Sequence, residues 1–187
     1  MDIDRKLTPI DWRILSKAIE RYTLDGFQYV ELPWIIPVKY NLITYNVPSR
    51  IHQTQNGALL GSAEQAFIAK DYNNLLGKGK FVSCSPCFRM EDYDVLHQEQ
   101  FMKVELYIND DTSVSNYERI LDNVHLVLRG FALGHGVPEI IETPEGHDII
   151  LNGIEIGSYG IREYEHIKWI YATGLAEPRF SLAKANY

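Results

Sequence analysis

The segment CFRMEDYDVLHQEQFMKVE, which begins at Cys87, combines residue types that suit the binding of a nucleotide. Arg89 follows one β-like run and Phe101 lies near the start of the next, with an acidic loop between them. A guanidinium can hold a phosphate through two parallel hydrogen bonds, and an aromatic face can stack on a base. The segment therefore predicts a nucleotide clamp. The alternative is a solvated hairpin with Phe101 in the core.

Two later segments add oxygen ligands and a further cation. Glu155 and Ser158 lie three residues apart in a β-like run that contains Gly157 and Gly160, and glycine inside a strand often marks a bulge or the close approach of a ligand. A carboxylate and a hydroxyl suit Mg²⁺, which proteins usually share with substrate phosphates. Arg179 opens a helix after an apolar strand, where an anion is favoured. An edge strand with a bulge and an ordinary strand–turn–helix are the respective alternatives.

The composition is that of a folded protein with one domain, residues 1–187. Hydrophobic residues make up 45% and aromatic residues 12% of the chain, which is enough for a sizeable core. The formal net charge is −7, so the surface as a whole should repel a phosphate backbone, and contact with nucleic acid would need a local basic patch. The charged start and the lack of a long apolar run predict neither a signal peptide nor a membrane span.

The two cysteines, Cys84 and Cys87, fit a reducing compartment, and we expect the protein to be cytoplasmic. A C-x-x-C redox pair needs its first cysteine at a helix start, but these residues lie in a β-like run. A zinc site would need two further closely spaced ligands. Both cysteines are therefore expected to be small core residues.

The first half of the chain predicts two helices, a strand and a long hairpin. Thr8 and Pro9 suit the start of a helix that Gly26 ends, and Ser62 with Gln65 suits a capping box. The expected elements are a helix over 9–24, a strand over 27–32, mostly loop over 33–50, a helix over 63–76 and hairpin strands over 81–88 and 98–108.

The second half predicts one long amphipathic helix and several short strands. Ser115 and Glu118 suit its capping box, and its apolar residues keep helical spacing. The expected elements are a helix over 116–133, strands over 139–141, 148–151 and 154–159, an ambiguous stretch to 169 and a helix from 179. Helices and strands do not alternate regularly, so we predict an α+β fold. Its antiparallel β-sheet would be flanked by helices, with the hairpin at its centre.

Taken in order, these segments resemble the catalytic core of class II aminoacyl-tRNA synthetases. The family's second motif is a strand–loop–strand with the pattern Phe-Arg-x-Glu and then His-x-x-x-Phe, which Phe88, Arg89, Glu91, His97 and Phe101 match. Its first motif, a helix and a strand ending in proline, resembles the helix before Gly26 with GFQYVELP. Its third, a glycine-rich strand and a helix starting with arginine, resembles GLAEPRF. SCSPCF and EIGS resemble the serine-type enzymes, and EIGSYGIRE also resembles the aspartate and asparagine branch.

The resemblance implies ATP and Mg²⁺ as cofactors and gives the candidate residues roles. Arg89 would hold the α-phosphate of ATP and the substrate carboxylate, Phe101 would stack on adenine, and Arg179 would reach the γ-phosphate. Glu91 and His97 would orient ATP or an acceptor. The remaining candidates are Ser62 and Glu64, from the loop that resembles the family's Thr-x-Glu loop, with Glu105, for the substrate, and Glu155 and Ser158, for ATP and the metal.

By the same resemblance, the reaction would be ATP-dependent activation of an amino acid, or a similar small carboxylate, to an acyl-adenylate. Transfer to tRNA or another acceptor is compatible with it, although the net charge does not indicate tRNA. A homodimer through the first motif is expected. Ala176 and Pro178 depart from the third motif, and we expect a free-standing paralogue without an anticodon-binding domain. The alternative is a non-catalytic paralogue that binds an amino acid, a nucleotide or a protein partner.

Overall fold

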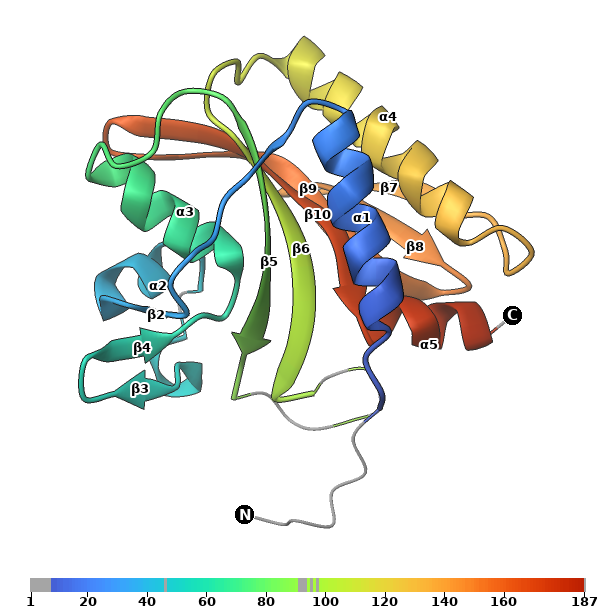
Figure 1. The fold of residues 1–187 in the computed structure, drawn as a ribbon, viewed down its shortest axis with the longest axis horizontal. Coiled ribbons are helices and arrows are strands. Elements are labelled where there is room, and N and C mark those ends of the chain that lie inside the picture. Colours follow the sequence, from blue (N-terminus) through green and yellow to red (C-terminus); the bar gives the residue numbers. More distant parts are fainter. Residues whose placement is uncertain (1–7, 46, 91–93, 95, 97, 187) are drawn as a thin grey trace.

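A seven-stranded sheet forms the centre of the computed structural model, which describes residues 8–45, 47–90, 94, 96 and 98–186. The strand order is β1-β5-β6-β10-β9-β8-β7, and every neighbouring pair is antiparallel except β1 with β5 (Figure 1). The strands are β1 (Gln28–Tyr29), β5 (Lys80–Phe88), β6 (Gln100–Ile108), β7 (Glu139–Thr143), β8 (Gly146–Leu151), β9 (Ile154–Tyr164) and β10 (Ile167–Glu177). The α+β prediction and the β5–β6 hairpin are confirmed, but β10 is the central strand.

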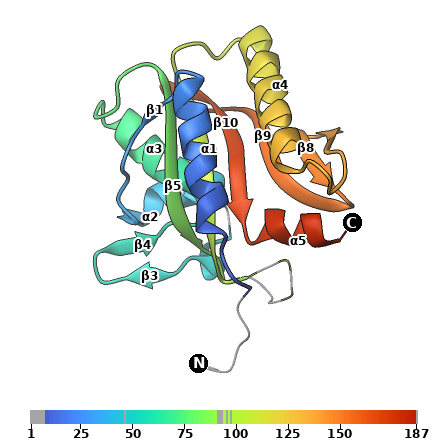
Figure 2. The same ribbon diagram turned by 45° about the vertical axis from the view of Figure 1, so that its right-hand side comes forward.

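Helices cover both faces of this sheet. On one face lie α1 (Trp12–Leu24), α4 (Val114–Phe131) and α5 (Arg179–Ala185), whose apolar side chains pack with those of the strands in one core cluster. On the other face, α2 (Val38–Thr44) and α3 (Ala63–Tyr72) share a second cluster with Trp169 and Tyr171 of β10 (Figures 1 and 2). The sheet is therefore packed against a hydrophobic core on each of its two faces.

Two helices begin at different caps from the predicted ones. In α1 the carboxylate of Asp11 accepts hydrogen bonds from the backbone N–H groups of Arg13 (3.0 Å) and Ile14 (3.2 Å), so Asp11, not Thr8, is the N-cap. In α4 the hydroxyl of Ser113 accepts from the N–H of residue 116 at 3.3 Å, in place of the predicted Ser115. Each cap satisfies N–H groups that would otherwise lack partners.

The prediction of mostly loop over 33–50 is wrong. This stretch forms β2 (Ile35–Ile36), α2 and a short 3₁₀ helix, η1 (Pro48–Arg50). Pro37 is the N-cap of α2, and a proline is tolerated where a helix starts. With β3 (Gln53–Thr54) and β4 (Gly57–Leu59), β2 makes a second, three-stranded sheet. The strand over 27–32 is reduced to β1, and α3 ends at Tyr72. The ambiguous stretch to 169 is the hairpin that joins β9 to β10.

Bulges in β9 and β10 change which side chains share a face. Ile149 and Ile150 of β8 pair with Gly157 and Glu155 of β9, so Ile156 is the extra residue on β9. On β10, the partner of Glu105 is Thr173 and that of Val104 is Leu175, which leaves Gly174 extra. Side chains of a regular strand alternate, so residues three apart face opposite ways unless a bulge intervenes. Each bulge therefore brings two residues three apart onto one face.

Buried tyrosine hydroxyls bind the backbone carbonyls at the β10 bulge. The hydroxyl of Tyr22, from α1, donates to the carbonyl of Gly174 at 2.9 Å, and that of Tyr159 donates to the carbonyl of Thr173 at 2.8 Å. Both bonds are buried, where an unsatisfied carbonyl is costly. The core thus supports the irregular backbone at the β10 bulge.

None of the described helices has the length and apolar composition that crossing a membrane requires.

We expect Gly174→Ala to lower the free energy of unfolding by about 1 to 3 kcal/mol. A Cβ atom there would lie 2.8 Å from Cε2 of Tyr22 and 3.1 Å from Cγ1 of Val104, both in the core. Chemical denaturation measures the change. The matched control is Gly130→Ala in α4, where a Cβ atom meets nothing within 4 Å and the helix should gain up to about 1 kcal/mol. Equal effects of the two substitutions would contradict the prediction.

Candidate functional site

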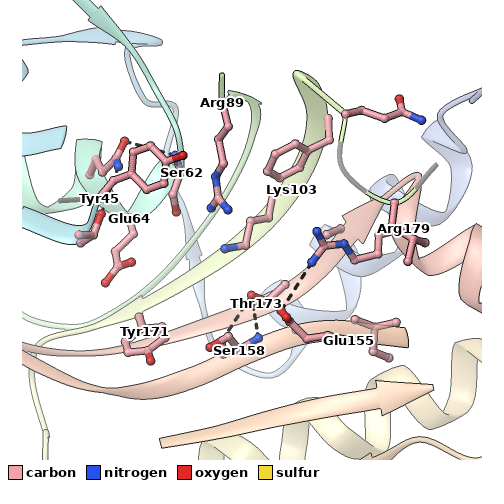
Figure 3. A pocket seen from close by; sticks show the side chains of 18 of the residues that line it. Tyr45, Ser62, Glu64, Arg89, Lys103, Glu155, Ser158, Tyr171, Thr173 and Arg179 are labelled. Carbon is pink, nitrogen blue, oxygen red and sulfur yellow. Dashed lines mark hydrogen bonds and ion pairs between the residues drawn. The ribbon is translucent and has the colours of Figure 1, made fainter. Parts of the chain in front are cut away.

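A cavity of about 250 Å³ opens on the face of the sheet that the bulges shape. Its walls come from the N-terminus of α3, the loop end of the β5–β6 hairpin, the bulged parts of β9 and β10 and the start of α5 (Figure 3). Seven predicted site residues line it: Ser62, Glu64, Arg89, Phe101, Glu155, Ser158 and Arg179. Segments far apart in the sequence therefore contribute to one site. The predicted Glu91 and His97 lie outside the described residues.

Arg89 and Phe101 lie together at the loop end of the β5–β6 hairpin. The β5–β6 ladder pairs Cys87 with Phe101, and Arg89 follows the end of β5. Nε of Arg89 donates to the carbonyl of Gly61 at 3.0 Å, and its guanidinium carbon lies 5.3 Å from the centre of the Phe101 ring and 5.7 Å from that of Tyr45. The guanidinium is thus positioned by α3's leading loop and by two aromatic rings.

Glu155 and Ser158 share the cavity face because the β9 bulge lies between them. The carboxylate of Glu155 is 3.6 Å from Nη1 of Arg179, and both side chains are partly exposed. The N–H of Ser158 donates to Oγ1 of Thr173 at 3.3 Å (Figure 3). Within the part of the chain that the structure describes, no three His, Cys, Asp or Glu side chains form a group that could hold a metal by themselves.

Glu105 is buried just beneath the cavity and is held by two lining residues. Its carboxylate accepts from the Ser62 hydroxyl at 2.7 Å and pairs with Nζ of Lys103 at 2.8 Å. Burial alone would raise the pKa of Glu105, but the charge of Lys103 and the hydrogen bonds outweigh it, and the pKa is lowered. Glu105 is therefore ionised at neutral pH.

Gln65 provides the other half of the predicted cap of α3, since its side chain accepts from the Ser62 N–H at 3.3 Å.

Glu64 belongs to a second buried network at the other end of the cavity. Both carboxylate oxygens accept from Nη1 of Arg162, at 2.9 and 2.8 Å, and one also accepts from the indole N–H of Trp169 at 2.8 Å. Burial raises the pKa of Glu64, and the charge of Arg162 opposes that rise. This carboxylate, predicted to contact substrate, is already bound on both oxygens by the protein.

Lys103, Arg162 and Tyr171 also line the cavity but were not predicted as site residues. A signal for the first was available, because Lys103 lies between Phe101 and Glu105 at the two-residue spacing of one strand face. Arg162 lies four residues after Ser158 on β9, which is also an even spacing and therefore the same strand face. Tyr171 lies in an unbroken apolar run, where nothing in the sequence separates the cavity face from the core face.

Comparisons with known proteins place the fold. No protein-family model matches the sequence, and a search of curated proteins finds no match. Among solved structures, pyrrolysyl-tRNA synthetase from Desulfitobacterium hafniense superposes with a TM-score of 0.75 at 14% identity, over 92% of this chain and 68% of that chain. A second structure of the same organism's enzyme gives 0.73 at 15%, over 92% of this chain and 66% of that chain.

Seryl-tRNA synthetase from Pyrococcus horikoshii, complexed with ATP, superposes with a TM-score of 0.76 at 19% identity. The match covers 92% of this chain but about half, 49%, of that chain. The fold is that of the class II aminoacyl-tRNA synthetase catalytic domain, as the sequence predicted.

Arg162→Ala should lower the free energy of unfolding by about 3 kcal/mol, because it leaves a buried carboxylate unpaired. Loss of the Arg162 charge raises the pKa of Glu64 further above its value in the unfolded chain. The folded variant then binds a proton that the unfolded chain does not, so its stability falls as pH rises. Denaturation at pH 5 and pH 8 should show the larger deficit at pH 8.

The control for that pH dependence is Glu64→Gln combined with Arg162→Ala. The glutamine can still accept from the Trp169 indole but carries no charge to titrate. We expect the additional pH dependence to disappear in this double variant. A deficit in Arg162→Ala that is the same at both pH values would show that the carboxylate is not what the arginine stabilises.

Proposed function

We propose that this chain binds ATP and an amino acid, or a similar small carboxylate, and joins them to an acyl-adenylate. The observation that carries the proposal is the convergence of Arg89, Phe101, Glu155 and Arg179 on one cavity, although they come from four separate elements. Four basic side chains line that cavity against two carboxylates, in a chain whose net charge is −7. The excess of positive charge favours an anionic ligand such as a nucleotide.

In the proposed reaction, a carboxylate oxygen of the substrate attacks the α-phosphorus of ATP. A new P–O bond forms as the bond from the α-phosphorus to the bridging oxygen breaks, and pyrophosphate leaves with that electron pair. Such a displacement depends on positioning and charge neutralisation more than on a covalent nucleophile. Arg89 neutralises charge at the α-phosphate, Phe101 stacks on adenine, and Arg179 binds the γ-phosphate. Ser62 and the ionised Glu105 bind the ammonium of an amino acid.

Magnesium fits this site as an ion shared with the substrate phosphates. Glu155 and the Ser158 hydroxyl are hard oxygen ligands on one face, and Mg²⁺ is usually bound by one or two carboxylates together with phosphate oxygens. The metal supplies charge neutralisation at the phosphates when bound. For Glu155 to serve as a ligand, Arg179 would have to turn from its ion pair with Glu155 toward the triphosphate.

The solved neighbours support the proposal at the level of fold, and one of them is described as complexed with ATP. We propose in addition that the protein is cytoplasmic, since Cys84 and Cys87 are both free thiols. Burial raises the pKa of Cys84 to about 11 and that of Cys87 to about 12, so neither forms a reactive thiolate at neutral pH.

Arg89→Ala should reduce the rate of adenylate formation by about 10² to 10³-fold, because a preorganised donor to the α-phosphate is lost. Phe101→Ala should instead weaken ATP binding by about 1 to 3 kcal/mol, as other aromatic–base stacks do. ATP–pyrophosphate exchange with each amino acid measures the first effect, and isothermal titration with ATP and Mg²⁺ measures the second. Arg129→Ala, on the exposed side of α4, is the matched control.

The two assays separate catalysis from binding alone. ATP binding without exchange for any amino acid would favour the non-catalytic paralogue. If Arg89→Ala changes neither exchange nor ATP affinity, this motif does not hold the nucleotide and the proposal fails.

We further propose a homodimer through α1 and the segment that contains β1 and β2. Large apolar side chains are exposed along these elements, including Trp12 at 63%, Trp34 at 51% and Ile35 at 44%. Light scattering at micromolar concentration should give twice the mass of the chain, and Trp12→Glu should shift the equilibrium toward monomer by burying a charge in the interface. A monomer in the wild-type protein at that concentration would overturn this proposal.

A further inference from the structure

The cavity has two chemically different ends, and only one of them suits a nucleotide. Glu155 and Arg179 lie at one end, whereas Glu64 and Tyr171 lie at the other (Figure 3). Arg89 and Lys103 lie between them, where a substrate carboxylate and the α-phosphate would meet. If ATP occupies the first end, the side chain of the acyl substrate must point toward the second. This orientation of the substrate rests on the proposed function.

Arg162 closes the second end of the cavity. Its guanidinium carbon lies 3.8 Å from the centre of the Tyr171 ring, in stacking contact. The same guanidinium binds both oxygens of Glu64 through Nη1 and reaches the carboxylate of Glu145 through Nη2 at 3.2 Å. Two carboxylates and one ring therefore position the group on three sides.

This wall cannot easily move aside for a larger ligand. The Glu64 side chain is only 5% exposed, and withdrawing Arg162 would leave its carboxylate buried without its cation. Tyr171 is backed by Gly160, where even a Cβ atom would lie 2.7 Å from Cε1 and from the hydroxyl of the tyrosine. The ring therefore has no room to recede. Rigid walls of this kind discriminate by size, whereas flexible side chains adapt.

We propose that Arg162 is a specificity-determining residue that limits the acyl substrate to an amino acid with a small, uncharged side chain, the size of glycine, alanine or serine. The guanidinium is already matched by Glu64 and Glu145, so it presents no unmet charge that would favour an acidic side chain. It acts on the substrate by occupying space.

The test uses non-reactive adenylate analogues, the aminoacyl-sulfamoyl adenosines, so that the readout does not depend on turnover. The glycyl, alanyl and seryl compounds form the small set, and the leucyl and phenylalanyl compounds form the large set. Isothermal titration with the whole protein should show the small set binding about 10- to 100-fold more tightly, the range in which hydrophobic size discrimination falls. ATP is titrated in parallel.

Two variants should relax this discrimination, and one should keep it. Glu64→Gln with Arg162→Ala removes the Arg162 side chain without leaving a buried charge. We expect the affinity for the large set to become similar to that for the small set. Arg162→Lys keeps a cation beside Glu64 but loses the planar group stacked on Tyr171, so it should relax discrimination even if the double variant fails to fold. Glu163→Gln is the matched control, since Glu163 follows Arg162 on β9 but is exposed and lies outside the cavity lining.

The outcomes separate this inference from the proposed function. If neither ATP nor any analogue binds the wild-type protein, the proposed function fails and the inference fails with it. If ATP binds but the large set binds as tightly as the small set, only the size limit is overturned. The assignment to Arg162 is also overturned if the limit persists unchanged in the variants that fold.

Discussion

The cavity depends on backbone bulges in two neighbouring strands and on the buried hydroxyls that satisfy one of them. The ladder between β9 and β10 ends at Ala172 paired with Tyr159, and beyond this pair the Thr173 side chain replaces a backbone contact to Ser158. The carbonyls of Thr173 and Gly174 bind Tyr159 and Tyr22. Burial raises the pKa of both tyrosines far above neutrality, so each remains protonated and can donate. The core thus supports the strand irregularity that the site requires.

Three ion pairs lie in or beneath the cavity, two with buried carboxylates and one that is partly exposed. Glu64 with Arg162 and Glu105 with Lys103 have carboxylates that are 5% and 1% exposed, whereas Glu155 with Arg179 is open to solvent. A buried pair is costly to break, because the remaining charge has no water to solvate it, and an exposed pair is worth little. A ligand can therefore rearrange Glu155 and Arg179 at small cost, while the other end of the cavity keeps its shape.

Much of the fold was predictable from local sequence patterns. The hairpin of β5 and β6 and the amphipathic helix α4 follow from periodicities of two and 3.6 residues, which need no tertiary information. The three-stranded sheet was missed because its strands are two or three residues long and β2 pairs with β4 more than twenty positions away. Such short strands have no periodicity of their own, and only their non-local pairing stabilises them.

The candidate site was predictable where a motif places its residues on one hairpin, and less so where distant elements meet. Arg89, Phe101 and Glu105 belong to one segment, whereas the partner of Glu64 lies 98 positions along the chain. Glycines in the EIGS segment indicated a bulge, which is what brings Glu155 and Ser158 together. Gly174 carries the same signal, a glycine inside a strand, and it also marks a bulge.

Glu105 and Glu64 are both buried, but the pKa of Glu105 is lowered whereas that of Glu64 is raised. Glu105 pairs with Lys103 on the same strand and receives a hydroxyl from Ser62, so its pKa is lowered and it stays an anion. Lys103 carries its charge on a flexible stem, but turning it away would leave a carboxylate that is 1% exposed without its cation. Glu64 is bound to a guanidinium on another strand, and its pKa is raised by burial. The cation that binds Glu64 is itself fixed by the Tyr171 ring and by Glu145, whereas the cation that binds Glu105 is carried on a flexible side chain.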